Sequence, residues 1–428
     1  MTPIPNLRWY ICGLLFLATT INYIDRQVLG LLKPMLAREL NWSETEYGWI
    51  TFSFQTAYAL MLLLSGRALD LIGTRAGFAI AIIVWSVAAM AHAFARTAGG
   101  FAAARFALGA GEAANFPACI KTVTEWFPAR ERALAVGILN SGSNVGAIVA
   151  PLVVPLIAVT WGWQAAFVLT GAVGFLWLVL WLWFYRKPED HPRLAATELA
   201  FIREGREAPA VPLQPLPWSR LFAVRATWAF ALGKFLTDPV WWFYLFWLPG
   251  FLDRTHGLNI LQMGVPLITI YLSADAGSIA GGWLSSTLLK RGWSLNAARK
   301  TTMLICALMV VPVMLVSRLG DNMWGAVALI SLATAGHQGW STNLFTVVSD
   351  LVPSRAVGSV VGIGGTAGAI GGMVTAPLIG YWLDWSGGAY GPVFLCFGTV
   401  YLVAFGVIHL LIPRFTPVDQ SRGDLRGS

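Results

Sequence analysis

The sequence predicts an all-α membrane protein with twelve transmembrane helices in two pseudo-symmetric six-helix bundles. Its 428 residues are 57% hydrophobic and 12% charged, with a mean hydropathy of +0.65. Soluble domains are about 45 to 50% apolar and about 25% charged. Apolar runs of about 20 residues, the length that crosses a bilayer, recur along the chain. One long polar break divides these runs into six and six.

The apolar runs define the expected elements in order. The long break at 186–225 is rich in Pro, Glu and Arg and is interpreted as a cytoplasmic linker loop. It separates an N-terminal bundle, 1–185, from a C-terminal bundle, 226–428, which ends in a short cytoplasmic tail. The twelve spans are expected near 9–33, 45–66, 76–95, 98–121, 131–158, 163–185, 226–252, 260–287, 299–317, 323–349, 356–383 and 390–412.

The basic residues predict the topology. Of the 29 Lys and Arg, 20 fall on the side of the N-terminus, five on the opposite side and four within spans. Cytoplasmic loops carry the excess of Lys and Arg, so both termini are expected in the cytoplasm of a multi-pass inner (plasma) membrane protein. The net charge of +8 is spread over short loops, which argues against nucleic-acid binding. The first apolar run exceeds signal-peptide length and is interpreted as a retained helix.

The cysteines and the missing enzyme motifs exclude several classes of protein. The sequence has no nucleotide loop of the Gly-xxxx-Gly-Lys-Ser/Thr type and no nucleophile elbow, so ATP-driven pumping and membrane-bound hydrolysis are unsupported. Neither a metal nor another cofactor is expected. Four cysteines in apolar segments are predicted to be small buried hydrophobic residues: Cys12, Cys119, Cys306 and Cys396.

Two charges lie within the fourth apolar run. Arg105 and Glu112 are seven residues apart, about two helical turns, so they project from one face of a helix. Charged residues inside a membrane span are rare and usually mark an ion or substrate path. This helix is therefore the first candidate for a functional site.

The two halves of the chain share a pattern of small residues. The offset between the matching positions is 226 residues, which favours a duplicated bundle around a midplane site. The alternative is that glycines spaced by four only form helix-packing faces. Gly142, Gly146, Ala150 and Pro151 match Gly368, Gly372, Ala376 and Pro377.

The loop after the second span carries a motif. The run Gly66-Arg-Ala-Leu-Asp70-Leu-Ile-Gly73-Thr-Arg75 resembles the signature loop of the major facilitator superfamily. This resemblance implies the major facilitator fold. In such a loop Asp70 is expected to cap a helix end and to pair with a basic residue across the bundle interface, latching one state.

Further motifs look like the anion:cation symporter family within that superfamily, and among its members the hexuronate transporters. The resemblance covers nearly the whole chain. The motifs are Asn22-Tyr23-Ile-Asp25-Arg26, Arg105 with Glu112, Trp126-Phe-Pro-Ala-Arg130, Asn140-Ser-Gly-Ser-Asn144, Lys234-Phe-Leu-Thr-Asp238-Pro-Val-Trp-Trp242 and His337-Gln338-Gly-Trp340-Ser-Thr-Asn343.

The resemblance implies a proton-coupled symporter that imports hexuronates such as glucuronate and galacturonate by alternating access. The alternative is a carrier of another sugar acid or small organic anion, such as galactonate or glucarate. A non-transporting sugar-acid receptor is less well supported, because the tail after Phe415 has only thirteen residues. The expected partners are the sugar acid, protons and the lipid bilayer, and the fold works as a monomer.

A sugar acid needs a cation for its carboxylate and neutral groups for its hydroxyls. Arg26 is expected to bind the carboxylate, as the matching arginine does in related carriers; the alternative is a permanent ion pair with a nearby acid. Tyr23 and Tyr58 are expected contacts, or core tyrosines. The full expected set is Asn22, Tyr23, Arg26, Tyr58, Asn140, Asn144, Trp242, His337, Gln338, Trp340 and Asn343.

For proton coupling, the resemblance implies the carboxylates of Asp25 and Glu112. Burial raises a carboxylate's affinity for protons and a neighbouring arginine lowers it, so pairing with Arg105 is expected to switch the carboxylate between its protonated and ionised states. The alternative is a static network that only joins the first and fourth spans. Lys234 and Asp238 are spaced by four and are expected to neutralise each other on one helix face. The signature-loop residues Gly66, Asp70, Gly73 and Arg75 complete the expected set.

Overall fold

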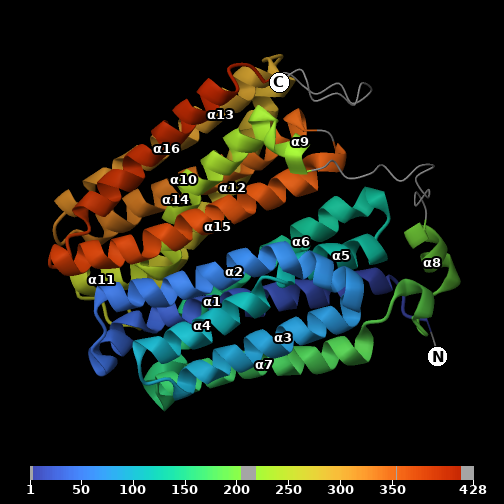
Figure 1. Cartoon of the computed structure of the whole chain (residues 1–428), viewed down its shortest axis with the longest axis horizontal. Helices are drawn as coiled ribbons and strands as arrows, with labels where there is room; N and C mark the ends of the chain where they lie inside the picture. The colour runs from blue at the N-terminus through green and yellow to red at the C-terminus, as the bar shows by residue number, and fades with distance from the viewer. Residues whose placement is uncertain (1–2, 204–217, 353, 416–428) are drawn as a thin grey trace. The chain divides into compact units, whose positions relative to one another are not determined.

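The computed structural model describes residues 3–203, 218–352 and 354–415, in which every regular element is a helix (Figure 1). The chain forms two compact units. Unit 1 comprises Met1–Trp42 and Ser53–Pro212, and unit 2 comprises Ser43–Phe52 and Leu213–Ser428. The α-helices are α1 (Leu7–Leu40), α2 (Glu44–Ile72), α3 (Thr74–Ala91), α4 (Ala98–Glu112), α5 (Asn115–Trp126), α6 (Ala129–Trp161), α7 (Trp163–Phe184), α8 (Ala196–Arg203), α9 (Trp218–Phe222), α10 (Arg225–Phe246), α11 (Leu248–His256), α12 (Gly264–Lys290), α13 (Leu295–Val310), α14 (Met323–Leu351), α15 (Ser354–Trp385) and α16 (Gly391–Leu411).

Seven helices in the described part of the chain are long and apolar enough to cross a membrane, and the bent α2 makes an eighth. Two predicted spans, 98–121 and 226–252, are not continuous helices as expected. The first breaks between α4 and α5, and the second breaks at Trp247 between α10 and α11. A proline ring clashes with the carbonyl four residues before it, and Pro117 and Pro249 follow the two breaks closely enough to cause them.

In unit 1, α1 packs along α6, and α3 lies beside α7 (Figure 1). The α1–α6 contact is close because glycines face the α1 backbone. A Cβ atom on Gly142 would lie 2.4 Å from the carbonyl oxygen of Phe16, and one on Gly146 would lie 2.6 Å from that of Thr20. Small residues allow helix backbones to approach in this way, so any side chain at either position would force the two helices apart.

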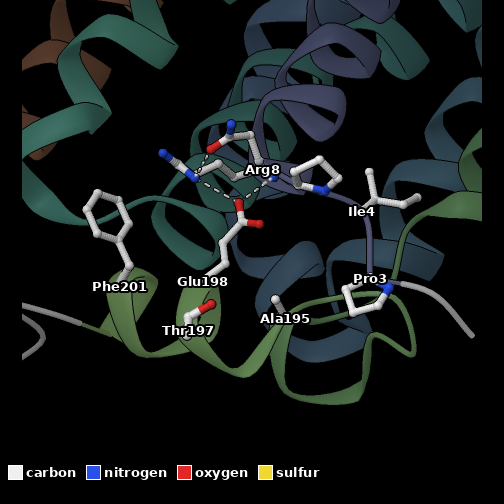
Figure 2. A pocket seen from close by; sticks show the side chains of 9 residues that line it. Pro3, Ile4, Arg8, Ala195, Thr197, Glu198 and Phe201 are labelled. Carbon is white, nitrogen blue, oxygen red and sulfur yellow. Dashed lines mark hydrogen bonds and ion pairs between the residues drawn. The ribbon is translucent and has the colours of Figure 1, made fainter.

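Part of the predicted linker loop docks on unit 1 as α8. The Glu198 carboxylate accepts hydrogen bonds from the backbone N–H groups of Leu7 (3.1 Å) and Arg8 (3.3 Å), at the first turn of α1. It also pairs with the Arg8 guanidinium at 2.8 Å, as Figure 2 shows. Arg8 binds Glu131 of α6 at 2.8 Å as well. The acid satisfies the free N–H groups of a helix start and joins α8 to α1 and α6. Residues 204–217 of the predicted loop lie outside the described residues, and its last part forms α9.

In unit 2, α10 packs along α15 in the same manner. A Cβ atom on Gly371 would lie 2.3 Å from the carbonyl oxygen of Phe235, and one on Gly368 would lie 2.1 Å from the Asp238 carboxylate. Thus Gly142 and Gly368, which the sequence repeat pairs, each lie on the helix that packs against α1 or α10. This equivalence favours a duplication over two unrelated packing faces.

The first turns of α2 belong to unit 2. Asp384 of α15 accepts hydrogen bonds from the backbone N–H groups of Glu44 (2.9 Å) and Thr45 (2.7 Å). The hydroxyl group of Tyr47 donates to the carbonyl oxygen of Phe246 at 2.7 Å. A carboxylate at a helix N-terminus binds free N–H groups and the positive end of the helix dipole, so Asp384 fixes where α2 begins.

The cysteines follow the prediction with one exception. Cys12, Cys119 and Cys306 are buried, whereas Cys396 is exposed. Cys396 lies on α16 next to Leu395, whose side chain is 56% exposed. The prediction failed for Cys396 because an apolar helix in a membrane protein also has an outward face that only lipid covers.

Candidate functional site

Helix α1 carries the Asn22-to-Arg26 motif into the interior of unit 1. Asn22, Asp25 and Arg26 are all buried. Residues four apart lie on one helix face, and the Arg26 Nη2 atom donates to the Asn22 Oδ1 atom at 3.2 Å. Asp25 points in another direction, as the sequence predicts, and makes no ion pair with Arg26.

The central contact of unit 1 is an ion pair between α1 and α4. The Arg26 Nε atom lies 2.8 Å from the Glu112 Oε2 atom, and the two side chains are 3% and 0% exposed. The expected pairing of Glu112 with Arg105 is absent from this structure. Seven residues along one helix span about 10.5 Å, which separates Arg105 from Glu112, whereas α1 lies close to both. Arg105 instead donates to the carbonyl oxygen of Arg26 at 2.9 Å.

Aromatic rings surround the two arginines. The Arg26 guanidinium lies 4.8 Å from the Tyr23 ring centroid, 4.9 Å from that of Tyr58 and 5.4 Å from that of Phe54. The Arg105 guanidinium lies 4.8 Å from the Phe54 ring. Cation–π contacts of this kind hold a guanidinium in a desolvated site. The structure therefore joins Tyr23, Tyr58 and Arg26, and adds Phe54, which the sequence motifs did not include.

Asp25 lies in unit 1 without an ion-pair partner among the described residues. Neither carboxylate oxygen meets the distance and angle limits of a hydrogen bond with a described donor, although the hydroxyl group of Thr170 on α7 is close enough to interact with the carboxylate. The charged groups close enough to influence it are Arg105 and Glu112. One Glu112 oxygen, Oε1, also has no hydrogen-bond partner within the described chain. Buried carboxylate groups of this kind are costly unless a cation or a proton neutralises them.

The amides of α6 lie on a more open face. Asn140 and Asn144 are both exposed. Ser143, between them, donates its hydroxyl hydrogen to the carbonyl oxygen of Asn140 at 2.6 Å. Because Gly142 and Gly146 hold α6 against α1, these amides belong to the same helix pair as Arg26 and are available to bind a ligand.

The signature motif is not an extended loop: it covers the last turns of α2, a one-residue break at Gly73 and the start of α3. Gly66 and Asp70 are on α2, and Gly73 takes φ = +86° between the helices, a backbone conformation that glycine adopts without strain. The Asp70 carboxylate pairs with Lys121 of α5 at 2.6 Å. Asp70 therefore has a basic partner inside unit 1, because α5, after its break from α4, brings Lys121 to the motif. The predicted pairing across the bundle interface stays a prediction.

In unit 2, the charges of α10 pair with each other. Lys234 lies 2.8 Å from Asp238, four residues later, which confirms the predicted local pair. His337 of α14 stacks on the Trp241 ring, with centroids 5.3 Å apart. Its Nδ1 atom lies 2.5 Å from the hydroxyl group of Tyr401 on α16, a residue that the sequence did not mark. The sequence carries no signal for Tyr401, because it lies in an apolar run.

The other expected residues of unit 2 divide into two groups. Trp340 is fully buried with its ring edge against Tyr401, and Asn343 donates to the carbonyl oxygens of Gly281 (3.1 Å) and Gly339 (2.9 Å). Both contacts are typical of helix packing. Trp242 and Gln338 are half-buried; Trp242 stacks on Phe246. The more accessible pair retains groups that a ligand could contact.

A metal site is not apparent within the described residues, which contain no group of three or more His, Cys, Asp or Glu placed to hold an ion. The polar groups of unit 1 instead combine the Arg26 guanidinium, the phenol rings of Tyr23 and Tyr58, and the amides of Asn22, Asn140 and Asn144. This set can bind a carboxylate and hydroxyl groups.

Known transporters are similar to this chain in sequence. Residues 15–376 match the family model described as Major Facilitator Superfamily. The chain is 33% identical to a hexuronate transporter of Escherichia coli (strain K12), over 99% of this chain and 98% of that protein. It is 34% identical to a galacturonate transporter of Dickeya chrysanthemi, over 73% of this chain and 91% of that protein. It is 30% identical to a D-galactonate transporter of Escherichia coli O6:H1, over 93% of this chain and 94% of that protein.

A solved structure shows the same fold. It is the crystal structure of a bacterial homologue of the human lysosomal transporter Spinster, in an inward-facing and occupied conformation. The TM-score is 0.76 at 20% sequence identity, with 97% of this chain and 100% of that chain covered. These findings confirm the fold and the resemblance that the sequence motifs predict: the chain belongs to the Major Facilitator Superfamily.

Proposed function

We propose that this transporter is a proton-coupled symporter that imports hexuronates such as glucuronate and galacturonate. The observation that carries the proposal is the buried Arg26–Glu112 pair, with Asp25 unpaired beside it. The names of two relatives, a hexuronate and a galacturonate transporter, support the choice of substrate. The protein would act by alternating access, in which the site opens to one side of the membrane at a time.

The proposed cycle depends on competition for Arg26. While Glu112 is ionised, it occupies the guanidinium at 2.8 Å. A proton that neutralises Glu112 would weaken this pair and free the fork of Arg26, which can bind a carboxylate through two parallel hydrogen bonds. The sugar acid would then replace Glu112 as the anion. Asp25 would take up and release a proton in the same cycle, because an ionised carboxylate there has no cation paired with it among the described residues.

The remaining groups would recognise the sugar hydroxyls. Tyr23 and Tyr58 already contact the Arg26 guanidinium, so their rings and hydroxyls would lie beside a bound carboxylate. Asn22, Asn140 and Asn144 would contribute amides from unit 1. In unit 2 we assign the same role to Trp242, His337 and Gln338. Trp340 and Asn343 would hold the helices that carry these three residues in place through packing.

A second substrate is favoured by a specific comparison. Relatives at 30% identity include the D-galactonate transporter and a probable galactarate/D-glucarate transporter of Escherichia coli (strain K12). These acids share the carboxylate and hydroxyl chemistry of hexuronates but are open-chain. We place the protein in the inner membrane with both termini in the cytoplasm, because the loop arginines and lysines follow that topology. We also propose that it acts as a monomer, since one chain supplies all of the proposed site residues.

The test is uptake of labelled glucuronate into proteoliposomes with an imposed inward proton gradient. Accumulation that the gradient drives, and that excess galacturonate but not galactonate displaces, is expected. Accumulation that is indifferent to the gradient would contradict the proton coupling. Strong galactonate uptake without glucuronate uptake would retain the transporter and change its substrate.

A further inference from the structure

The outward face of α7 is a continuous apolar stripe. Leu169, Val173, Leu176, Leu180 and Trp183 recur every three or four residues, and each is at least 41% exposed. Residues at this spacing lie on one side of a helix, and α7 is one of the helices long and apolar enough to cross a membrane. Lipid acyl chains would therefore cover this stripe, which ends at Trp183.

A basic cavity lies where the stripe ends. It encloses about 190 Å³, several times the volume of about 30 Å³ that one water molecule occupies in the liquid. The Arg193 guanidinium lies 5.6 Å from the Trp183 ring centroid, so a tryptophan of the lipid-facing stripe and a cation share one wall. The lining residues are Trp183, Phe184, Arg186, His191, Pro192 and Arg193.

Arg186 and Arg193, which line the cavity, have no acidic partner among the described residues. Arg186 donates to the carbonyl oxygen of Leu182 at 2.9 Å, and Arg75 of α3 donates to the same oxygen. No ion pair within the described residues reaches Arg75, Arg186 or Arg193. Two guanidinium groups that converge on one carbonyl repel each other, and the negative end of the α7 dipole offsets only part of that repulsion. A bound anion would neutralise the positive charge that remains.

The acids of the same loop are directed elsewhere. Glu189 and Asp190 do not line the cavity, and Glu189 lies 3.9 Å from Arg203 of α8. The His191 side chain lines the cavity but contacts backbone groups rather than either arginine side chain. Its Nε2 atom lies 3.0 Å from the carbonyl oxygen of Phe184, and its Nδ1 atom accepts a hydrogen bond from the Arg193 backbone N–H at 3.2 Å.

These two bonds fit a neutral imidazole, which fixes the turn from Phe184 to Arg193. The pKa of His191 is lowered by burial and by the neighbouring charges of Arg186 and Arg193. The turn is therefore held by backbone contacts without consuming either guanidinium. Both arginines remain directed to the cavity and its surroundings.

We propose that the cavity at the end of α7 binds the phosphate group of an anionic phospholipid, whose acyl chains lie along the apolar stripe. Arg186 and Arg193 would contact the phosphate oxygens, and Trp183 would lie at the boundary between headgroup and chains, where tryptophan is enriched. Basic pockets at the cytoplasmic ends of membrane helices suit anionic headgroups. This site is separate from the proposed sugar-acid residues.

The experiment is native mass spectrometry of the delipidated full-length protein titrated with phosphatidylglycerol or with phosphatidylcholine of the same chains. Arg186→Gln/Arg193→Gln removes the two cations. Lys290→Gln/Arg291→Gln, at the end of α12, removes two basic charges elsewhere and is the matched control. We expect the pocket variant to lose roughly tenfold or more in phosphatidylglycerol affinity, since charged hydrogen bonds are the strong ones. The control should keep the wild-type affinity.

Three outcomes would overturn the proposal. The first is equal affinity of the wild-type protein for the two lipids, and the second is an equal loss in both variants. The third is displacement of the lipid by millimolar inorganic phosphate, which would show a site for free phosphate. If the Gln variant does not fold, Arg186→Lys/Arg193→Lys carries the test. It retains the charge but loses the planar fork, so an intermediate affinity supports the proposal and an unchanged affinity overturns it.

Discussion

The two units carry their buried charges differently. In unit 1 the ion pair joins two helices, Arg26 on α1 and Glu112 on α4, and the side chains are 3% and 0% exposed. In unit 2 the pair of Lys234 and Asp238 lies within α10, and the side chains are 11% and 16% exposed. Unit 2 also has a pair between helices, Arg299 of α13 with Asp350 of α14, but those side chains are 10% and 23% exposed. A pair within one helix stays together when helices move, whereas a pair between helices can be separated. Because the Arg26–Glu112 pair is both between helices and the more deeply buried, unit 1 is the better candidate for the switching step.

The largest expected effect comes from removing the cation of the unit 1 pair, compared with removing the cation of the unit 2 pair in a separate variant. Arg26→Gln leaves Glu112 buried without its partner, and breaking a buried pair costs about 3–5 kcal/mol. We expect loss of uptake and a lower temperature of thermal unfolding. Lys234→Gln should lower both much less, because Asp238 is partly exposed. Uptake and unfolding measured on both variants make the comparison; equal losses would remove the distinction between the units.

A double variant separates stability from transport. Arg26→Gln/Glu112→Gln removes both buried charges and should regain most of the thermal stability. It should not regain uptake, because no guanidinium remains to bind the substrate carboxylate. Recovery of uptake in this variant would contradict the role of Arg26.

The next effect concerns coupling. Glu112→Gln cannot release a proton, so gradient-driven accumulation should fall to the equilibrium level while substrate exchange continues. Asp238→Asn, the matched change in unit 2, should still accumulate substrate. Counterflow and gradient-driven uptake in the same proteoliposomes measure the two activities. If Asp238→Asn loses accumulation and Glu112→Gln retains it, the coupling belongs to unit 2.

A smaller change is expected at Asp25. Asp25→Asn has nearly the shape of the protonated acid, breaks no ion pair of the described chain and keeps an oxygen that can accept from Thr170, so the unfolding temperature should stay the same or rise. The proposed cycle predicts one proton fewer per substrate. The reversal potential of transport at several proton gradients gives this ratio, and an unchanged ratio would leave Asp25 outside the coupling.

The smallest expected effect is in unit 2. Tyr401→Phe removes the hydroxyl group that contacts His337 at 2.5 Å and the carbonyl oxygen of Thr237 at 3.3 Å. Without this hydroxyl group His337, which we propose contacts the sugar, would be held less firmly. One hydrogen bond is worth about 1 kcal/mol, so the KM for glucuronate should rise about fivefold with the maximal rate preserved. The dependence on the proton gradient should not change. Titration of uptake against substrate at two gradients checks both statements.

Local spacing explains which parts of the site could be predicted. Lys234 and Asp238 lie four residues apart on one helix, and their pairing follows from sequence alone. The partner of Glu112 does not, because it depends on how α1 and α4 are placed against each other. Lys121, which pairs with Asp70, reaches the signature loop only after the chain breaks between α4 and α5.

Apolar surroundings explain what was missed. Phe54 and Tyr401 lie in runs where aromatic residues are usual, so nothing in the sequence separates them from lipid-facing neighbours. The fold itself could be predicted from the sequence, because apolar runs of membrane length and the signature loop are local patterns. The helix breaks near Pro117 and Pro249 were overlooked because hydropathy continues across them.

The close contact of α1 with α6 has a consequence for ligand affinity. Since Gly142 and Gly146 leave no space between the backbones, Arg26 on one helix and Asn140 and Asn144 on the other keep a fixed spacing. A ligand that uses both helices would not have to order them at the moment of binding. That saving in conformational entropy is a form of preorganisation, so substituting either glycine should weaken binding even though neither has a side chain to offer.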